Sequence, residues 1–348
     1  MKNKIYINAR FLTQSLTGVQ RFAMEISGIL KNDFPNRYIW VSPANIKHQE
    51  IAKNLEVEVT GDHSGHFWEQ YELPKYLKKK HSPILLNLCN AAPLMYSNNI
   101  STIHDVAFYE NPEWFSKRFV FFYKFLIPKI VRSSKLVFTV SEFSKNEIHK
   151  YISKPLDQIE VVHNSVSKIF VPGKFSEERL ILTVSTLQPR KNLITLINSF
   201  VEIQDESLKL VIIGSENRLF ASSKIKQIIE GDERIILTGY LTDDKLVEYY
   251  QKALIFVYTS LYEGFGIPPL EAMACGTSTI VSDIPVFREL YDDATMFFQS
   301  ESDLTNKIKF LLDNQELRSD KIKRGLNLVN KYSWRTSAIK IDKILSAL

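Results

Sequence analysis

The sequence predicts an α/β protein built from two α/β/α domains in tandem. Short apolar runs rich in β-branched residues alternate with amphipathic segments, and this alternation occurs as two series along the 348 residues. Because the predicted strands are apolar on both faces, they indicate parallel sheets covered by helices on each side. The length supports two domains, since it exceeds what one ordinary domain holds.

The first series contains the strands and helices expected of one such domain. Its predicted strands are 4–9, 39–42, 84–88, 101–103, 136–140 and 159–163. Its predicted helices are 18–30, 114–133 and 142–151.

The second series repeats the pattern. Its predicted strands are 180–185, 208–214, 235–239, 254–258 and 279–282. Its predicted helices are 192–203, 221–230, 242–252, 269–274 and 303–312.

A polar stretch with Pro172 and Gly173 separates the two series and marks the domain boundary. The tail has apolar residues at helical spacing, and its most economical use is to pack back on the first domain. The predicted domains are therefore 1–170 with the tail helix 331–348, and 171–330.

Composition and charge limit the kind of protein. Residues 1–172 hold 22 Lys and Arg against 15 Asp and Glu, while the remainder holds 22 against 24. The basic first half suggests an anionic partner such as a lipid surface or a phosphorylated acceptor, although a solvated basic face explains it equally well. No recognisable nucleic-acid-binding module is present, so no nucleic-acid partner is expected.

The cysteines and apolar segments indicate a cytoplasmic protein, with association at the cytoplasmic face of the membrane left open. Cys89 and Cys275 match no zinc or CxxC spacing and are expected to be buried free thiols. The N-terminus lacks the apolar core of a signal peptide, and the run 119–131 is too short to span a bilayer.

Nucleotide-type ligands bind open α/β sheets beyond the carboxyl ends of the strands, so the cleft between the two predicted domains is the expected site. No GxGxxG follows a predicted strand and no GxxxxGK[ST] occurs, which counts against a nicotinamide dehydrogenase and a P-loop kinase.

The strongest motif is YTSLYEGFGIPPLEAMACG at 258–276. Gly264 and Gly266 form a turn before a proline-started helix, where a backbone can approach an anion closely. A diphosphate there would place a sugar near Glu263 and a ribose near Glu271, and carboxylates suit vicinal hydroxyls. Two glutamates taken alone are more often capping or surface residues.

The complete string resembles the EGFGxxxLEAMAxG signature, with its E-x7-E pair, of retaining glycosyltransferase family 4. That resemblance implies the GT-B fold, in which two Rossmann-like α/β/α domains face a central cleft, with an N-terminal acceptor-binding domain and a C-terminal nucleotide-sugar-binding domain. It further implies that Glu263 contacts donor-sugar hydroxyls and that Glu271 binds the ribose. The amides of Phe265 and Gly266 would approach the sugar and phosphate.

Three other segments are similar to segments of the same family. VSTLQPRKNLITLINSF at 184–200 implies that Arg190 and Lys191 hold the donor diphosphate and stabilise its growing charge, although many members carry the arginine earlier in the loop. ISTIHDVAFYENPEWF at 100–115 implies that His104 orients the transferred sugar. The TGVQRF segment implies that Gly18 lines the diphosphate and acceptor, with Gln20 replacing the family's second glycine. Surface or structural roles are the alternatives for each.

The resemblance implies a retaining, metal-independent glycosyltransferase with no cofactor besides its nucleotide-sugar co-substrate. No DxD motif occurs, and His63 and His66 have no suitably spaced partners for a metal. The preferred donor is GDP-mannose, with UDP-N-acetylglucosamine, UDP-glucose and dTDP-rhamnose as alternatives. An epimerase acting on UDP-N-acetylglucosamine and a non-catalytic nucleotide-sugar-binding subunit also remain open.

The acceptor is expected to be a saccharide or a polyprenyl-diphosphate-linked saccharide in bacterial surface polysaccharide synthesis. Segment 114–135 mixes aromatic and basic residues, and Lys78–Lys80 adds basic surface. This combination suits a membrane interface, with core packing of the aromatic residues as the alternative.

Overall fold

The computed structural model describes residues 4–173, 178–186, 188–214 and 223–348, and of 223–226 only the backbone. The chain divides into two compact units. Unit 1 comprises Met1–Asn164 with Ser333–Leu348, and unit 2 comprises Ser165–Tyr332. The boundary between the two units thus lies between Asn164 and Ser165. The sequence interpretation placed this boundary after residue 170.

Unit 1 contains a seven-stranded parallel sheet in the order β3-β2-β1-β4-β5-β6-β7. Its strands are β1 (Ile5–Asn8), β2 (Tyr38–Ser42), β3 (Glu58–Val59), β4 (Leu85–Asn87), β5 (Asn99–Thr102), β6 (Leu136–Thr139) and β7 (Ile159–Val161). All of them except β3 confirm predicted strands. β3 was missed because its two residues are both exposed at the sheet edge and carry no apolar pattern.

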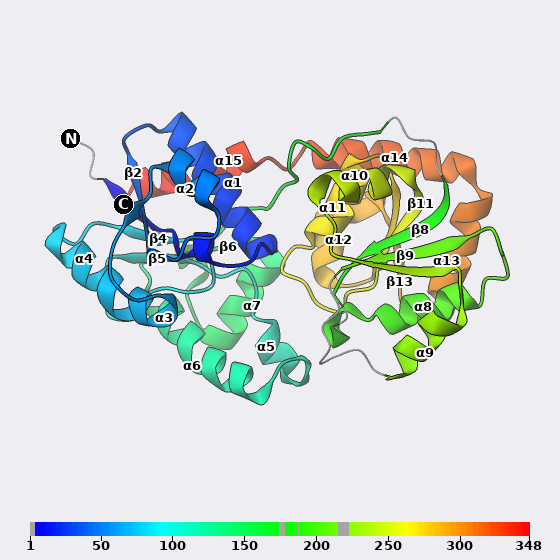
Figure 1. The fold of residues 1–348 in the computed structure, drawn as a ribbon, viewed down its shortest axis with the longest axis horizontal. Helices are drawn as coiled ribbons and strands as arrows, with labels where there is room; N and C mark the ends of the chain where they lie inside the picture. The colour runs from blue at the N-terminus through cyan, green and yellow to red at the C-terminus, as the bar shows by residue number, and fades with distance from the viewer. Residues whose placement is uncertain (1–3, 174–177, 187, 215–222) are drawn as a thin grey trace. The chain divides into compact units, whose positions relative to one another are not determined.

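Helices cover the unit 1 sheet. They are α1 (Gly18–Asp33), α2 (Gln49–Leu55), α3 (Gly65–Phe67), α4 (Leu73–Lys79), α5 (Ala107–Glu110), α6 (Lys117–Ser133), α7 (Glu142–Ile152) and α15 (Trp334–Ser346). The predicted start of α6 at residue 114 was wrong, because Ser116 accepts a hydrogen bond from the Phe119 amide and caps the helix there. The tail helix α15 lies beside α1 within unit 1, red beside blue in Figure 1.

Unit 2 contains a six-stranded parallel sheet in the order β10-β9-β8-β11-β12-β13. Its strands are β8 (Glu178–Val184), β9 (Lys209–Ile213), β10 (Ile235–Gly239), β11 (Ala253–Tyr258), β12 (Ser278–Ser282) and β13 (Met296–Phe298). The first five confirm predicted strands, and the three-residue β13 was missed.

The helices of unit 2 form two layers around this sheet (Figure 1). They are α8 (Leu193–Val201), α9 (Ser223–Gly231), α10 (Asp243–Lys252), α11 (Ile267–Ala274), α12 (Pro285–Tyr291), α13 (Glu301–Asp313) and α14 (Gln315–Val329). Helices α8 and α13 bury leucine, isoleucine and phenylalanine side chains against the sheet. The sequence interpretation did not include α12 and α14, and residues 221–222 of the predicted helix 221–230 lie outside the described residues.

Each sheet therefore has one point at which the strand order reverses. In unit 1 it lies between β1 and β4, and in unit 2 between β8 and β11. Loops leaving such a pair of strands diverge, and the space beyond their carboxyl ends is where parallel sheets bind ligands. None of the helices in the described part of the chain combines the length and apolar character needed to cross a bilayer.

Candidate active site

The loops that follow β8 and β11 are joined at the reversal point of the unit 2 sheet. The Thr259 hydroxyl donates a hydrogen bond to the carbonyl oxygen of Lys191 at 2.7 Å, and the Leu261 amide donates to the carbonyl oxygen of Arg190 at 2.8 Å. Lys191 ends a short 3₁₀ turn, Pro189–Lys191. These bonds fix the basic loop against the loop that carries Glu263.

A buried ionic cluster occupies this junction. The Lys191 ammonium and the Glu263 carboxylate form an ion pair, and the two residues are only 9% and 8% exposed. Arg190 approaches the other carboxylate oxygen of Glu263, with Nη1 3.4 Å from Oε2. The hydroxyls of Tyr258 and Ser260 donate to Glu263 Oε1 at 2.8 and 2.7 Å. Lys191 Nζ also donates to the Tyr258 hydroxyl oxygen at 2.7 Å.

These contacts determine the protonation state of the cluster. Burial of Glu263 raises its pKa, but the charges of Lys191 and Arg190 outweigh burial and lower that pKa to about 2. Burial raises the pKa of Tyr258 well above its ordinary value, so its hydroxyl stays protonated. Two cationic side chains thus surround one ionised carboxylate, and the three together carry one net positive charge.

Gly266 gives the turn before α11 its shape. It is the N-cap of α11 and has a φ of +85°, a conformation that favours glycine. A Cβ atom at this position would lie 2.6 Å from Cε1 of Phe287. The Tyr291 hydroxyl donates to the carbonyl oxygens of Gly266 and Phe265, which further fixes the turn.

The start of α11 differs from an ordinary helical anion site. Pro268 and Pro269 occupy its first turn and have no N–H group to donate. The first helical turn therefore lacks two of the amides that an anion usually meets at a helix N-terminus. The Phe265 side chain is buried with its ring against Tyr332, at 5.5 Å between centroids, so only its backbone suits a ligand.

Glu271 lies in the second turn of α11 and is buried. The Tyr250 hydroxyl of α10 donates to Glu271 Oε2 at 3.0 Å. Burial raises the pKa of Tyr250 well above its ordinary value, so the hydroxyl stays protonated and can donate this hydrogen bond. The tyrosine therefore orients the carboxylate.

The two candidate residues of unit 1 lie near α1. His104 follows β5 and is buried, with Nε2 3.0 Å from the carbonyl oxygen of Leu88 and its ring edge-to-face with Phe22. Burial lowers the pKa of His104, so the imidazole is neutral at pH 7. Gly18 is exposed at the first position of α1. Gln20 donates to the side chain of Gln14 at 2.8 Å and so braces the loop where the family has a glycine.

The structure brings Arg190, Lys191 and Glu263 together, and it places Phe265, Gly266 and Glu271 around the start of α11. The sequence interpretation missed Tyr258, Ser260 and Tyr250, whose hydroxyls hold the two glutamates. Tyr258 and Ser260 lie within the quoted motif, but no spacing rule assigns them to Glu263.

A second buried cluster, also missed, lies at the reversal point of unit 1. Asn8 Nδ2 donates to Glu69 at 2.8 Å, and Arg10 Nε pairs with the same carboxylate at 3.0 Å. Burial of Glu69 raises its pKa, but its contacts with His66, Arg10 and Asn8 outweigh burial and hold that pKa below the ordinary value. This cluster fixes Arg10 in the loop after β1.

The described residues were expected to hold neither a metal site nor a reactive thiol. In the part of the chain that the structure describes, no three His, Cys, Asp or Glu side chains group as metal ligands would. His63 pairs with Glu72, and His66 pairs with Glu69. Burial raises the pKa of both cysteines to about 12, so neither thiol is a nucleophile at neutral pH.

Comparison with known proteins agrees with this architecture. The family model described as glycosyl transferases group 1 matches residues 165–327, which fall within unit 2. The Anabaena protein HepE in complex with UDP and glucose has a similar structure, with a TM-score of 0.79 and 16% identity over 99% of this chain and 100% of that one. The fold is thus that of the GT-B glycosyltransferases.

Bacterial enzymes are similar in sequence over most of the chain. The O-antigen chain mannosyltransferase RfbU of Salmonella typhimurium is 31% identical over 246 residues, which cover 70% of this chain and 67% of the relative. The O-antigen chain mannosyltransferase B of Escherichia coli is 28% identical over 267 residues, covering 71% and 70%.

A third relative, from Campylobacter jejuni, is the N-acetylgalactosamine-N,N'-diacetylbacillosaminyl-diphospho-undecaprenol 4-alpha-N-acetylgalactosaminyltransferase. It is 24% identical over 274 residues, covering 74% of this chain and 68% of the relative. On the strength of these matches, the chain is a glycosyltransferase. It belongs to the group 1 glycosyl transferases, in agreement with the resemblance of the 258–276 motif to a glycosyltransferase family.

Proposed function

We propose that this glycosyltransferase is a retaining, metal-independent enzyme that moves mannose from GDP-mannose to a saccharide acceptor in bacterial surface polysaccharide synthesis. The observation that carries the proposal is the cluster of Arg190 and Lys191 on Glu263, at the reversal point of the unit 2 sheet. Mannose is preferred because two of the relatives are named O-antigen chain mannosyltransferases.

Arg190 and Lys191 would bind the donor diphosphate. When the bond between the sugar C1 and the phosphate oxygen breaks, negative charge grows on the departing diphosphate. Fixed cations in a water-poor site stabilise that charge without reorganising, and they supply what a divalent ion supplies in other transferases. The amides of Phe265, Gly266 and Ile267 would contact the same group.

Glu263 suits sugar binding better than acid–base or covalent chemistry. A carboxylate whose pKa is about 2 is a weak proton acceptor at neutral pH. Tyr258, Ser260 and Lys191 also occupy its Oε1 atom. We therefore assign it the donor-sugar hydroxyls, and assign the ribose hydroxyls to Glu271.

The transfer step then needs no protein nucleophile. The acceptor hydroxyl oxygen bonds to C1 on the face from which the diphosphate leaves, and the leaving phosphate oxygen takes the hydroxyl proton. The products are GDP and the mannosylated acceptor with its anomeric configuration retained. His104 would orient the transferred sugar, and Gly18 would line the diphosphate and acceptor.

The acceptor proposed here is a saccharide, free or linked to a polyprenyl diphosphate at the cytoplasmic face of the membrane. The C. jejuni relative is named for an undecaprenol-diphosphate-linked acceptor, which supports the lipid-linked form.

The proposal is tested by incubating the full chain with GDP-mannose, saccharide acceptors and EDTA. GDP release with a matching mass gain of the acceptor, and an α-linked product from the α-linked donor by NMR, are the expected results. UDP-N-acetylglucosamine, UDP-glucose and dTDP-rhamnose are run in parallel, and transfer from one of them alone contradicts the choice of mannose. Conversion of a donor sugar without acceptor would instead identify an epimerase.

A further inference from the structure

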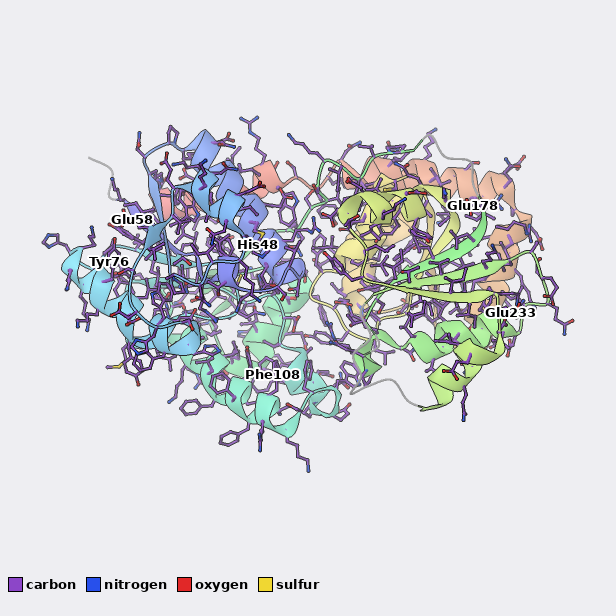
Figure 2. All side chains as sticks on the ribbon, viewed as in Figure 1. His48, Glu58, Tyr76, Phe108, Glu178 and Glu233 are labelled. Carbon is purple, nitrogen blue, oxygen red and sulfur yellow. The ribbon has the colours of Figure 1, made fainter. Side chains whose placement is uncertain are left out.

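The outer face of α6 exposes an unusual number of aromatic side chains. Phe121 is 81% exposed and Phe125 is 55% exposed, while Leu126, Ile127 and Ile130 on the opposite face are buried in the core of unit 1. Phe108, labelled in Figure 2, is buried next to α6, and several rings project outward from that helix. For segment 114–135, the sequence left core packing of the aromatic residues open as an alternative. Core packing thus explains only some of these rings, because the outer ones face solvent.

A second group of exposed apolar side chains lies on the neighbouring segment 65–79 and on the loop before β5. Tyr71 is 61% exposed and Met95 is 73% exposed. Both line an open groove with Lys75, Lys78 and Lys79 of α4. Gln70 ties this loop to the segment, because it bonds to the backbone of Ala92 and Leu94 at 2.9 Å.

The two groups form one continuous surface. The rings of Phe67 and Tyr71 are 5.0 Å apart between centroids, and the His66 ring lies 5.6 Å from Phe122 of α6. We call this the aromatic–basic surface and define it by Phe67, Tyr71, Phe121 and Phe125 with the cations of α4 and α6. Exposed apolar side chains that gather on one face, rather than being scattered singly, mark an interaction site.

The charges on the two helices of this surface, α4 and α6, have one sign. The acidic residues of the preceding turns are Glu69, which is buried, and Glu72, which pairs with His63. Helix α6 carries Lys117, Arg118, Lys124, Lys129 and Arg132 and no acidic residue. The segment 73–80 carries Lys75 and Lys78–Lys80 and no acidic residue. Lys129 Nζ lies 3.6 Å above the Phe125 ring, so cation and aromatic ring are directly juxtaposed.

We infer that the aromatic–basic surface docks unit 1 on a bilayer rich in anionic lipids. Aromatic rings insert at the level of the headgroups, and flanking lysines contact the anionic lipid phosphates. Charge complementarity selects this occupant. A second copy of the chain presenting the same surface would place like charges opposite one another. The surface belongs to unit 1, and its test does not depend on the donor or the reaction.

The test is co-sedimentation of the full chain with phosphatidylcholine vesicles, with and without phosphatidylglycerol. The native chain is expected to bind only the anionic vesicles, and less at high salt. Phe121→Ser with Phe125→Ser should weaken this binding roughly tenfold. Replacing Lys75, Lys78 and Lys79 by Gln should weaken it roughly 100-fold, at about 1 kcal/mol for each cation.

A matched control comes from unit 2. Lys309 and Phe310 are an exposed lysine–phenylalanine pair on α13, and Phe310 is 53% exposed, like Phe125. Lys309→Gln with Phe310→Ser should bind vesicles as the native chain does. All variants should melt at the native temperature, since the changed side chains are exposed.

The inference is overturned if the native chain does not bind anionic vesicles, or if it binds both vesicle types equally. It is also overturned if the α6 and α4 variants bind as tightly as the native chain. If sedimentation equilibrium shows a native dimer that Phe121→Ser with Phe125→Ser dissociates, without a change in vesicle binding, the surface is a subunit interface. Nucleotide binding, measured separately, reports on the proposed function and not on this surface.

Discussion

Lys191 and Glu263 are 72 residues apart in the sequence and form a buried ion pair at the reversal point of the unit 2 sheet. Breaking a buried pair from one side leaves an uncompensated charge, whereas replacing both partners with apolar residues does not. This asymmetry gives the first prediction.

Lys191→Met should lower the free energy of unfolding by about 3–5 kcal/mol. The double change Lys191→Met with Glu263→Leu should cost less than Lys191→Met alone. The single change leaves the buried Glu263 carboxylate with Arg190 alone, at 3.4 Å, whereas the double change removes that carboxylate and leaves only the more exposed Arg190. Denaturant unfolding measures both. The exposed pair Lys245–Glu248 is the control, and Lys245→Met should change stability by less than about 1 kcal/mol. A double variant less stable than the single one contradicts the geometry.

Acid stability should depend on Glu263. Its pKa is lowered from 4.5 to about 2 on folding, so the carboxylate stabilises the native state above pH 4.5 and loses that contribution as the pH falls toward 2. The contribution is on the order of 3 kcal/mol. Melting temperatures recorded from pH 6 down should fall more steeply for the native chain than for Glu263→Gln. Parallel curves would show that the carboxylate is not held ionised by Lys191 and Arg190.

Gly266→Ala should destabilise unit 2 by about 1–3 kcal/mol, since the residue has a left-handed φ and a Cβ atom would meet the Phe287 ring. It should also weaken nucleotide binding by moving the turn amides. Gly28→Ala in α1 is the control, because a Cβ there meets nothing within 4 Å and alanine favours the helix. Equal melting temperatures for the two variants would contradict the role given to Gly266.

Glu271 should make the protein prefer a nucleotide with the 2′ and 3′ ribose hydroxyls over one that lacks them. The native chain is expected to bind GDP more tightly than 2′,3′-dideoxyguanosine diphosphate, and Glu271→Gln should lose most of that difference. Tyr250→Phe removes the hydroxyl that orients Glu271 and should lose part of it. Calorimetric titration of the two nucleotides into the three proteins measures all six affinities. If Glu271→Gln keeps the full preference for GDP, the carboxylate does not bind the ribose.

The sequence predicts this fold well wherever burial and sequence pattern coincide. Strands such as β11, buried at every residue, have an apolar pattern that local sequence reveals. The edge strand β3 has no such pattern, and α14 was missed because most of its residues are polar and few are buried.

The residues of the candidate site likewise fall into those that the sequence predicts and those that it does not. Lys191 and Glu263 are predicted by motifs with a fixed spacing, whereas Arg190 is predicted although many family members carry the arginine earlier in the loop. The hydroxyls of Tyr258, Ser260 and Tyr250 are not, because their bonds to the two glutamates depend on how loops fold together. Likewise, the exposure of Phe121 and Phe125 depends on which face of α6 packs on the sheet, and alternating aromatic and basic residues do not determine that face.

The most direct test of the account is calorimetric titration of GDP, UDP and dTDP into the native chain and Arg190→Gln, with divalent ions chelated by EDTA. Arg190 contacts Glu263 at the edge of the cluster and is the more exposed of the two cations. The account predicts that at least one diphosphate binds the native chain in EDTA. It also predicts that Arg190→Gln binds that diphosphate roughly tenfold or more weakly, as expected for a lost charge-assisted hydrogen bond. Binding that requires a divalent ion, or equal affinity in the variant, would contradict it.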